Sequence, residues 1–249
     1  MSDRIQLTIA ACTGKTGSPE PFDRLVFPAG RTVAIVGPTG SGKTRLLADI
    51  ERLSPGDSPT RRQVFLDNAP AGLVDADRAV ARISQSMQFF LDLTVGEFLE
   101  LHRDGLGIPA ADVDFDNIVA QANLLAGEPF YADTPLAALS GGQARALMIS
   151  DVLGISKAPV LLVDEIENAG IDRHAALDIL GGKDRLVFLA THDPLLALRA
   201  DVRLVLGGGA IRTVVETTPG ERKLADRLAS ADRRTILMRE SLRRGEILA

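Results

Sequence analysis

Short runs of apolar, often β-branched residues recur along this chain and alternate with longer segments of helical spacing. The apolar runs cover 32–36 (TVAIV), 160–165 (VLLVDE), 186–193 (LVFLATHD) and 202–206 (VRLVL), and each run predicts a β-strand. Strands that are apolar throughout are typical of a parallel sheet with helices on both faces. The pattern therefore predicts an α/β fold with a mainly parallel sheet flanked by helices.

Two segments depart from this alternation. The segment 94–138 contains helix-like runs (VGEFLELH and FDNIVAQANLLAG) without a convincing strand, and we expect a helical insert there. The segment 216–249 is polar and predicted to be helical, with eight Lys or Arg and six Asp or Glu. Mixed charge of this kind is typical of a solvated helix. Docking of this tail onto the body of the protein or onto a partner is the alternative.

Composition narrows the class of protein. The chain has 249 residues, of which 45% are hydrophobic and 24% charged, as is ordinary for a globular protein. The net charge of -5 gives no strong nucleic-acid signal, because binding to phosphates favours a basic surplus. Cys12 is the only cysteine, which excludes an intrachain disulfide and a cysteine-rich metal site. No apolar run suits a signal peptide or a membrane span. We expect a cytoplasmic protein that reaches the inner face of a membrane only through a partner.

The loop after the first predicted strand matches the pattern G-x-x-x-x-G-K-[ST], and a helical segment follows it. In that context the glycines let backbone amides point at phosphate oxygens, and the helix N-terminus attracts the same anion. Lys43 is expected to bridge the β- and γ-phosphates and the Thr44 hydroxyl to coordinate Mg²⁺. The loop consists of Gly37, Pro38, Thr39, Gly40, Ser41, Gly42, Lys43 and Thr44, with Arg45 next.

Polar residues end two of the later strands. Asp164 and Glu165 close the second apolar run, at the sheet edge where ligands bind in open α/β folds. Asp164 is expected to hold Mg²⁺, and Glu165 to polarise the attacking water as a general base. Capping of the next helix is the alternative role for this acidic pair. His192 ends the third run, where it is either structural or close to a bound γ-phosphate. His102 and His174 are expected to be surface residues.

The stretch LSGGQ, from Leu139 to Gln143, interrupts two apolar, helix-like runs. Adjacent glycines in or near a helix cost backbone entropy. Something should be gained at Ser140, Gly141 and Gly142, and this stretch alone does not say what.

These motifs, in this order, resemble those of the ATP-binding cassette (ABC) ATPases over about residues 1–215. In the resemblance the loop 37–44 is the Walker A motif and 139–143 the signature motif. Asp164 and Glu165 correspond to Walker B with its catalytic glutamate. The remaining correspondences are Gln85 with the Q-loop glutamine, Asp172 with the D-loop aspartate and His192 with the switch histidine.

The resemblance implies a P-loop NTPase with an N-terminal antiparallel β portion, a nucleotide-binding core at 1–93 and 139–215, a helical subdomain at 94–138 and a C-terminal tail. It implies ATP and Mg²⁺ as ligands, held between two subunits arranged head to tail in a homodimer or a heterodimer with a related subunit. The expected catalytic residues are Glu165, His192, Lys43 and Gln85. The expected metal ligands are Thr44, Gln85 and Asp164. The expected nucleotide-binding residues are those of 37–45 together with Ser140, Gly141, Gly142, Gln143 and Asp172.

The chain departs from the family pattern at several positions. No aromatic residue lies in IAACTGKTG, where the family carries one that stacks on adenine, and Phe22 is the nearest substitute. This departure leaves the preference for ATP over GTP open. Ile166 stands where the family usually has a proline after the catalytic glutamate, and NAGID (168–172) stands where it more often has Ser-Ala-Leu-Asp. After LSGGQ the usual run of basic residues is reduced to Arg145. None of these changes removes a reactive group, so active ATP hydrolysis is expected.

Two biological roles stay open. The chain is expected to be the ATPase subunit of an ABC transporter, docked under membrane-spanning subunits at a groove between Gln85 and the helical insert. The apolar residues Met87, Phe89, Phe90 and Leu91 would line that groove, or they pack between the core and the insert. The alternative is a soluble ABC ATPase that activates, matures or remodels a protein complex, such as a metalloenzyme.

Overall fold

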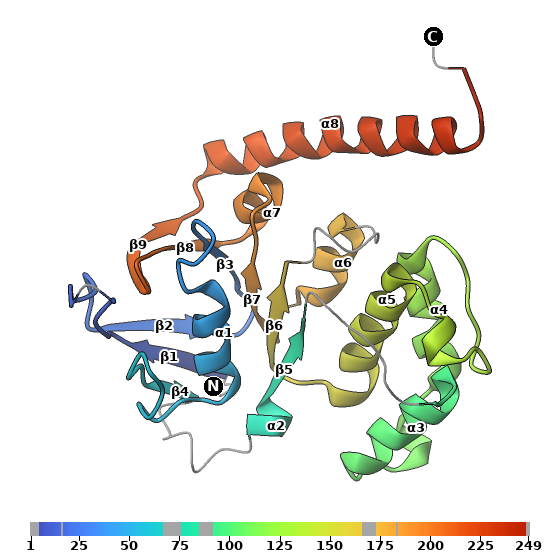
Figure 1. The fold of residues 1–249 in the computed structure, drawn as a ribbon, viewed down its shortest axis with the longest axis horizontal. Coiled ribbons are helices and arrows are strands. Elements are labelled where there is room, and N and C mark those ends of the chain that lie inside the picture. Colours follow the sequence, from blue (N-terminus) through green and yellow to red (C-terminus); the bar gives the residue numbers. More distant parts are fainter. Residues whose placement is uncertain are drawn as a thin grey trace.

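The computed structural model describes residues 5–15, 17–66, 76–84, 92–165, 173–182 and 184–247 (Figure 1). Within them a main sheet has the strand order β5-β6-β7-β3-β8-β9, and a smaller sheet has the order β2-β1-β4. The main sheet is parallel except for the antiparallel β8–β9 pair, and both pairings in the small sheet are antiparallel. The strands are β1 (Gln6–Ala10), β2 (Arg24–Pro28), β3 (Thr32–Val36), β4 (Val64–Leu66), β5 (Val80–Ile83), β6 (Val160–Asp164), β7 (Leu186–Ala190), β8 (Val202–Gly207) and β9 (Ala210–Glu216).

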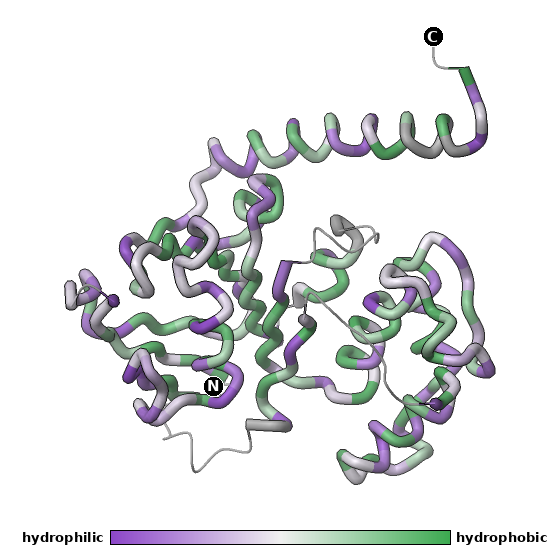
Figure 2. Tube along the Cα trace, viewed as in Figure 1, coloured by the Kyte–Doolittle hydropathy of each residue, from purple (hydrophilic) through white to green (hydrophobic). Residues whose placement is uncertain are grey.

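The central strands are apolar throughout because both of their faces are buried. Every residue of β6 and β7 is buried. Figure 2 shows these strands as mainly hydrophobic, and the hydrophilic end of β6 is Asp164. Side chains of a strand alternate between faces. Accordingly Val160 and Leu162 belong to the core on the α1 side of the sheet, whereas Leu161 and Val163 belong to the core shared with α5. The predicted α/β fold, including its N-terminal antiparallel portion and helical insert, is confirmed.

The helices lie on both sides of the main sheet. In the view of Figure 1, α1 lies on one side of β6, whereas α3, α4 and α5 form a group on the other side. A capping box between Thr94 and Glu97 begins α3, and α4 packs closely on α5. The helices are α1 (Lys43–Glu51), α2 (Ala76–Ala79), α3 (Val95–Gly105), α4 (Phe115–Ala126), α5 (Gly141–Asp151), α6 (Arg173–Leu180), α7 (Pro194–Arg199) and α8 (Pro219–Arg243), with short turns η2 (Ala110–Asp112), η3 (Leu136–Ala138) and η4 (Val152–Ser156).

The C-terminal helix α8 packs on the body through its first half. Ala225 and Ala229 are buried against Leu195 of α7, and the rest of the helix extends away from the molecule (Figure 1). Leu237 and Leu242 in its second half are largely exposed. No helix in the described part of the chain has the length and apolarity needed to cross a bilayer.

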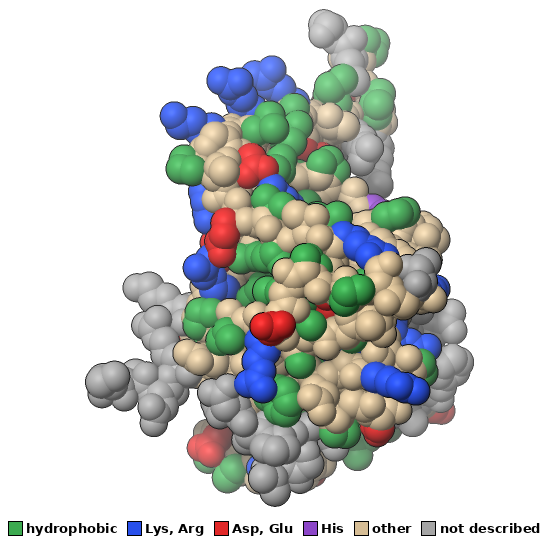
Figure 3. Space-filling view, turned by 90° about the vertical axis from the view of Figure 1, so that its left-hand side faces the viewer, with side chains coloured by type: hydrophobic (Ala, Val, Ile, Leu, Met, Phe, Trp, Pro, Cys, Tyr) green, Lys and Arg blue, Asp and Glu red, His purple; other side chains and the backbone are tan. Residues whose placement is uncertain are grey.

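Predicted and observed strand ends differ slightly. The third apolar run predicts a strand that continues to Asp193, but β7 ends at Ala190. His192 therefore lies in the loop after the strand rather than on it. The side of the molecule near the small sheet, seen in Figure 3, carries Lys and Arg side chains, several of which gather at its upper left. Hydrophobic and uncharged side chains and a few Asp and Glu cover the rest of this side.

Candidate active site

The loop 37–42 connects β3 to α1 in a backbone shape that only glycine adopts readily. Gly40 and Gly42 have φ values of 78° and 108°, in the region that favours glycine. A Cβ atom on Gly37 would lie 2.5 Å from the Leu206 carbonyl oxygen. Gly42 is the N-cap of α1 and offers no side chain to cap it. The amides of the first helical turn are thus left for an anion.

Lys43 is the cation of this loop, and it is buried, with a relative exposure of 7%. Its Nζ atom donates to the Gly37 carbonyl oxygen at 3.0 Å and lies 2.9 Å from His192 Nε2. Ser41 Oγ, in the same loop, is buried without a hydrogen-bond partner in the described part of the chain. A buried hydroxyl of this kind is costly unless a ligand satisfies it.

Glu165 lies at the end of β6 and faces the same histidine. Its Oε1 atom is 3.4 Å from His192 Nε2. Its backbone is left-handed, with φ of 49°, and is held by a hydrogen bond from its N–H to the Ala190 carbonyl at 2.9 Å. Arg145 of α5 donates to the Glu165 carbonyl at 3.3 Å. The structure thus brings a lysine, a histidine and a carboxylate together at one edge of the sheet.

Asp164, the neighbouring carboxylate, is bound by Arg82 of β5. Arg82 Nη2 donates to Asp164 Oδ2 at 2.9 Å, and Nη1 donates to Glu51 Oε2 at 2.8 Å. Burial lowers the pKa of Arg82, but its hydrogen bonds to the two carboxylates outweigh this and raise it above the ordinary value. Arg82 is not among the residues predicted from the motifs. The signal available was a charged residue in an otherwise apolar strand-like piece, VARI.

The stretch Ser140–Gln143 forms the exposed N-terminus of α5. Ser140 Oγ accepts from the Gln143 N–H at 3.3 Å, and Gln143 Oε1 accepts from the Ser140 N–H at 2.8 Å, a reciprocal capping box. A Cβ atom on Gly141 would meet nothing within 4 Å, so the fold alone does not require glycine there. Figure 1 shows α5 and α1 on opposite sides of β6.

A hollow of about 370 Å³ lies beside the start of α1. Lys15, Arg45 and Arg61 make it strongly basic. Phe22 packs against the core of the main sheet instead and does not line it. The hollow is lined by Thr13, Gly14, Lys15, Gly42, Arg45, Leu46, Asp49, Pro59, Thr60, Arg61, Arg62, Leu206 and Gly209.

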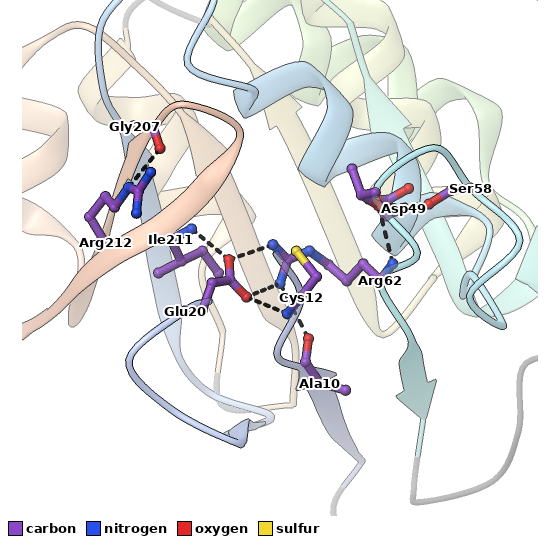
Figure 4. A network of polar contacts seen from close by, with 10 residues as sticks. Ala10, Cys12, Glu20, Asp49, Ser58, Arg62, Gly207, Ile211 and Arg212 are labelled. Carbon is purple, nitrogen blue, oxygen red and sulfur yellow. Dashed lines mark hydrogen bonds and ion pairs between the residues drawn. The ribbon is translucent and has the colours of Figure 1, made fainter. Parts of the chain in front are cut away.

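A buried ion pair holds the loops around this hollow (Figure 4). Arg62 donates to both oxygens of Glu20, at 2.6 and 3.0 Å. Glu20 also accepts the backbone N–H groups of Cys12, at 2.9 Å, and Ile211, at 2.6 Å. Burial is the main cause that raises the pKa of the Cys12 thiol to about 11, so this thiol is neutral at pH 7.

His102, expected to be a surface residue, is partly exposed but pairs with a buried carboxylate. Its Nδ1 atom lies 2.8 Å from Asp151 Oδ1, and Asp151 is fully buried. The hydrogen bond to Asp151 raises the pKa of His102, and burial raises the pKa of Asp151. Both residues border an apolar hollow of about 330 Å³ with Phe98, Leu101 and Met148. A sequence cannot show this pairing, because the residues lie 49 positions apart.

Several predicted residues lie outside the described part of the chain. These are Gln85, Met87, Phe89, Phe90, Leu91, Ile166 and Asp172. His174 falls in α6, but its side chain is not among those described.

Comparison with known proteins gives consistent matches. A family model described as ABC transporter matches residues 24–168. An uncharacterized ABC transporter ATP-binding protein of Methanocaldococcus jannaschii is 40% identical over 247 residues, covering 98% of this chain and 94% of that protein. A mycobactin import ATP-binding/permease protein of Mycolicibacterium smegmatis is 30% identical, but this chain spans only 33% of its length.

Solved structures agree on the fold. A structure titled as the ATP binding subunit of an ABC transporter has a TM-score of 0.68 at 20% identity, covering 88% of this chain and 92% of that one. The cbiO1 structure from Clostridium perfringens has a TM-score of 0.66 at 20% identity, covering 92% of this chain and 98% of that one.

Proposed function

The chain belongs to the ABC transporter family and is an ABC-type ATPase, and we propose that it binds Mg-ATP between two subunits arranged head to tail and drives a membrane-spanning partner. The observation that carries this proposal is the cluster of Lys43, His192 and Glu165 beside a loop shaped for an anion. A phosphate fits this loop. The loop offers uncapped helix amides, the buried ammonium of Lys43 and the unpartnered hydroxyl of Ser41.

In the proposed reaction each side chain has a separate task. Lys43 binds the β- and γ-phosphates together with the amides of 37–45 and stabilises the charge that develops on them. Glu165 orients the attacking water and accepts its proton. His192, already within hydrogen-bond distance of Lys43, holds the γ-phosphate from the other side. Gln85, which lies outside the described residues, is proposed to complete this set.

The proposed Mg²⁺ ligands supply oxygen atoms, as this ion requires. Thr44 stands exposed in the first turn of α1, and Asp164 ends β6. Mg²⁺ commonly takes one or two protein oxygens and fills its other positions with water and phosphate. These residues therefore fit the ion, which when bound would neutralise charge on the phosphates. Gln85 is the third proposed ligand.

The basic hollow next to Arg45 is the proposed site of the base and ribose. It adjoins the phosphate loop through Gly42, and its volume of about 370 Å³ suits a nucleoside. Its lining contains no aromatic side chain. Polar contacts from Lys15 and Thr60 would then replace stacking on the base.

The proposed dimer follows from the exposed signature stretch. Ser140 and the amides of Gly141 and Gly142 lie at a helix N-terminus that attracts anions. This end of the helix is open to solvent, and so is available to the γ-phosphate of a neighbouring subunit. Gln143 and Asp172 are proposed to lie at the same interface. The partner is a second copy or a related ABC subunit.

Relatives that carry transport names favour a transporter subunit over a soluble ATPase acting on a protein complex. The apolar hollow at Phe98, Leu101 and Met148 belongs to the helical group and would extend the groove proposed for the membrane-spanning subunits. The protein would then work in the cytoplasm, at the inner face of the membrane.

The dimer is tested with Glu165→Gln, which is expected to keep the fold and to slow hydrolysis. With saturating Mg-ATP this variant is expected to double its mass in size-exclusion chromatography with light scattering. Adding Ser140→Arg should keep it monomeric while nucleotide still binds, and Lys43→Met should abolish binding. A Glu165→Gln protein that binds ATP but stays monomeric would overturn the head-to-tail arrangement.

The partner is tested by affinity capture from separate membrane and soluble fractions. A multi-span protein should co-purify with the wild type and be lost with Leu101→Glu, whose ATP binding should be unchanged. Capture of a soluble enzyme complex by both proteins would favour the alternative role.

A further inference from the structure

We propose that Arg82 is a positioning residue for the metal ligand Asp164. The inference rests on the proposed function, because it concerns the Mg²⁺ assigned to that carboxylate. Arg82 does not itself touch the reacting groups. It acts by fixing the orientation of Asp164 through one guanidinium that also binds Glu51.

The contacts are specific to an arginine. Nη1 and Nη2 each donate to a different carboxylate, at 2.8 and 2.9 Å, which are the short distances of charge-assisted hydrogen bonds. The guanidinium thus links β5, the last residue of α1 and the end of β6. A lysine has a single charged nitrogen on a flexible stem and cannot reproduce this planar bridge.

Burial strengthens the interaction between Arg82 and Asp164. The side chains of Arg82 and Asp164 are only 20% and 11% exposed, so their interaction is poorly screened by solvent. Arg82 Nε is buried without a hydrogen-bond partner in the described residues. The guanidinium is therefore held in place by its two carboxylates.

The bridge restricts what Asp164 can do. Because Oδ2 accepts from Arg82, Oδ1 is the oxygen left for a metal ion, and rotation of the side chain would break the bond to the guanidinium. Without the guanidinium, Asp164 would sit close to Glu51, a group of like charge, and would regain rotamer freedom. Both changes oppose a fixed metal ligand.

The test measures metal binding rather than activity. Binding of Mn²⁺ to the full-length protein, saturated with the non-hydrolysable analogue AMP-PNP, is followed by the electron paramagnetic resonance signal of free Mn²⁺. Arg82→Met is expected to weaken Mn²⁺ binding at least fivefold, and Arg82→Lys at least threefold. Binding of fluorescent ATP in EDTA should stay within twofold of wild type in both variants, because the phosphate loop is untouched.

Arg78→Met is the matched control, since Arg78 lies on the adjacent α2 and donates to the Leu106 carbonyl instead. It should leave the Mn²⁺ affinity within twofold of wild type. An affinity of Arg82→Lys within twofold of wild type would overturn the proposal, and Arg82→Lys decides it if Arg82→Met does not fold. A tighter Mn²⁺ site in Arg82→Met would also overturn it, by showing that the guanidinium only repels the ion.

Asp164→Asn separates this proposal from the proposed function. If this variant binds Mn²⁺ as the wild type does, the assignment of the metal to Asp164 is wrong, whatever Arg82 does. If Asp164→Asn weakens binding and both Arg82 variants do not, only the positioning role fails.

Discussion

Glu165 combines a reactive carboxylate with a backbone conformation that its residue type disfavours. A glutamate at φ of 49° stores of the order of 1 kcal/mol of strain, whereas asparagine tolerates this region better. We expect Glu165→Asn to be more stable than Glu165→Gln by about 0.5–1 kcal/mol, since both lose the carboxylate contact to His192. Chemical denaturation of the nucleotide-free proteins measures the difference.

The rate of ATP hydrolysis by Glu165→Asn and Glu165→Gln is the second quantity to compare. Both variants should lose roughly 10²- to 10⁴-fold in turnover, as expected when a general base is removed. Equal stabilities of the two variants would show that the strain at Glu165 is negligible. If Glu165→Asn is more stable than Glu165→Gln but inactive, the backbone strain at Glu165 is the cost of placing the general base correctly.

At the same scale, sequence reasoning identified the residues that carry a local pattern. Lys43 and the glycines belong to one contiguous motif, and Asp164 and Glu165 end an apolar strand. Arg82 and the His102–Asp151 pair have no such pattern, because their roles arise only when distant elements pack together. The motif locates the phosphate loop. The residues that bind the carboxylates of Asp164 and Asp151 become apparent only from the tertiary structure.

Between elements, the His102–Asp151 pair links α3 to the end of α5. The folded-state pKa of His102 is raised by its hydrogen bond to Asp151. The stabilisation is therefore fully present below the unfolded pKa of about 6.5 and is lost as pH rises through the folded value. We expect the stability gap between the wild type and Asp151→Asn to narrow from pH 6 to pH 8.5, as measured by urea denaturation.

The carboxyl group of Asp151 shifts in the same direction as His102 and adds to the same trend. Burial raises the pKa of Asp151 from the ordinary 3.8, so any stability linked to its own protonation is present at acid pH and lost as pH rises through its folded value. Parallel stability profiles for the wild type and Asp151→Asn between pH 6 and 8.5 would mean that the pair adds no pH-dependent stability.

Elements differed in how well the sequence predicted them. The sequence predicts β3, β6 and β7 because strands buried on both faces form continuous apolar runs. It predicts β8 from its buried Val202, Leu204 and Leu206, which alternate with partly buried residues. The shorter β4 and the amphipathic β9 give no such signal, since β4 has three residues and β9 exposes most of its second half. Their pairing depends on partners that lie far away in the chain.

Across the whole molecule, the Glu20–Arg62 pair joins the small sheet to the main one. Glu20 accepts the N–H of Ile211 in β9, while Arg62 lies just before β4 (Figure 4). The two side chains are 0% and 3% exposed. Removal of one partner from such a pair leaves a buried charge uncompensated, so Arg62→Met should cost about 3–5 kcal/mol of folding free energy.

The double variant Glu20→Gln/Arg62→Met distinguishes the buried charge from lost packing. The N–H groups of Cys12 and Ile211 bond different oxygens of Glu20, so the single oxygen of the glutamine amide keeps one of these two bonds. Because the amide carries no buried charge, the double variant should still be ~1 kcal/mol more stable than Arg62→Met alone. Cys12 offers an independent readout, because its neutral, half-buried thiol reacts slowly while the network is closed. A disulfide reagent should label Cys12 fastest in Arg62→Met and more slowly in the double variant.

If the double variant is the less stable of the two, the carboxylate charge contributes favourably even without its arginine, and the pair is not what joins the two sheets.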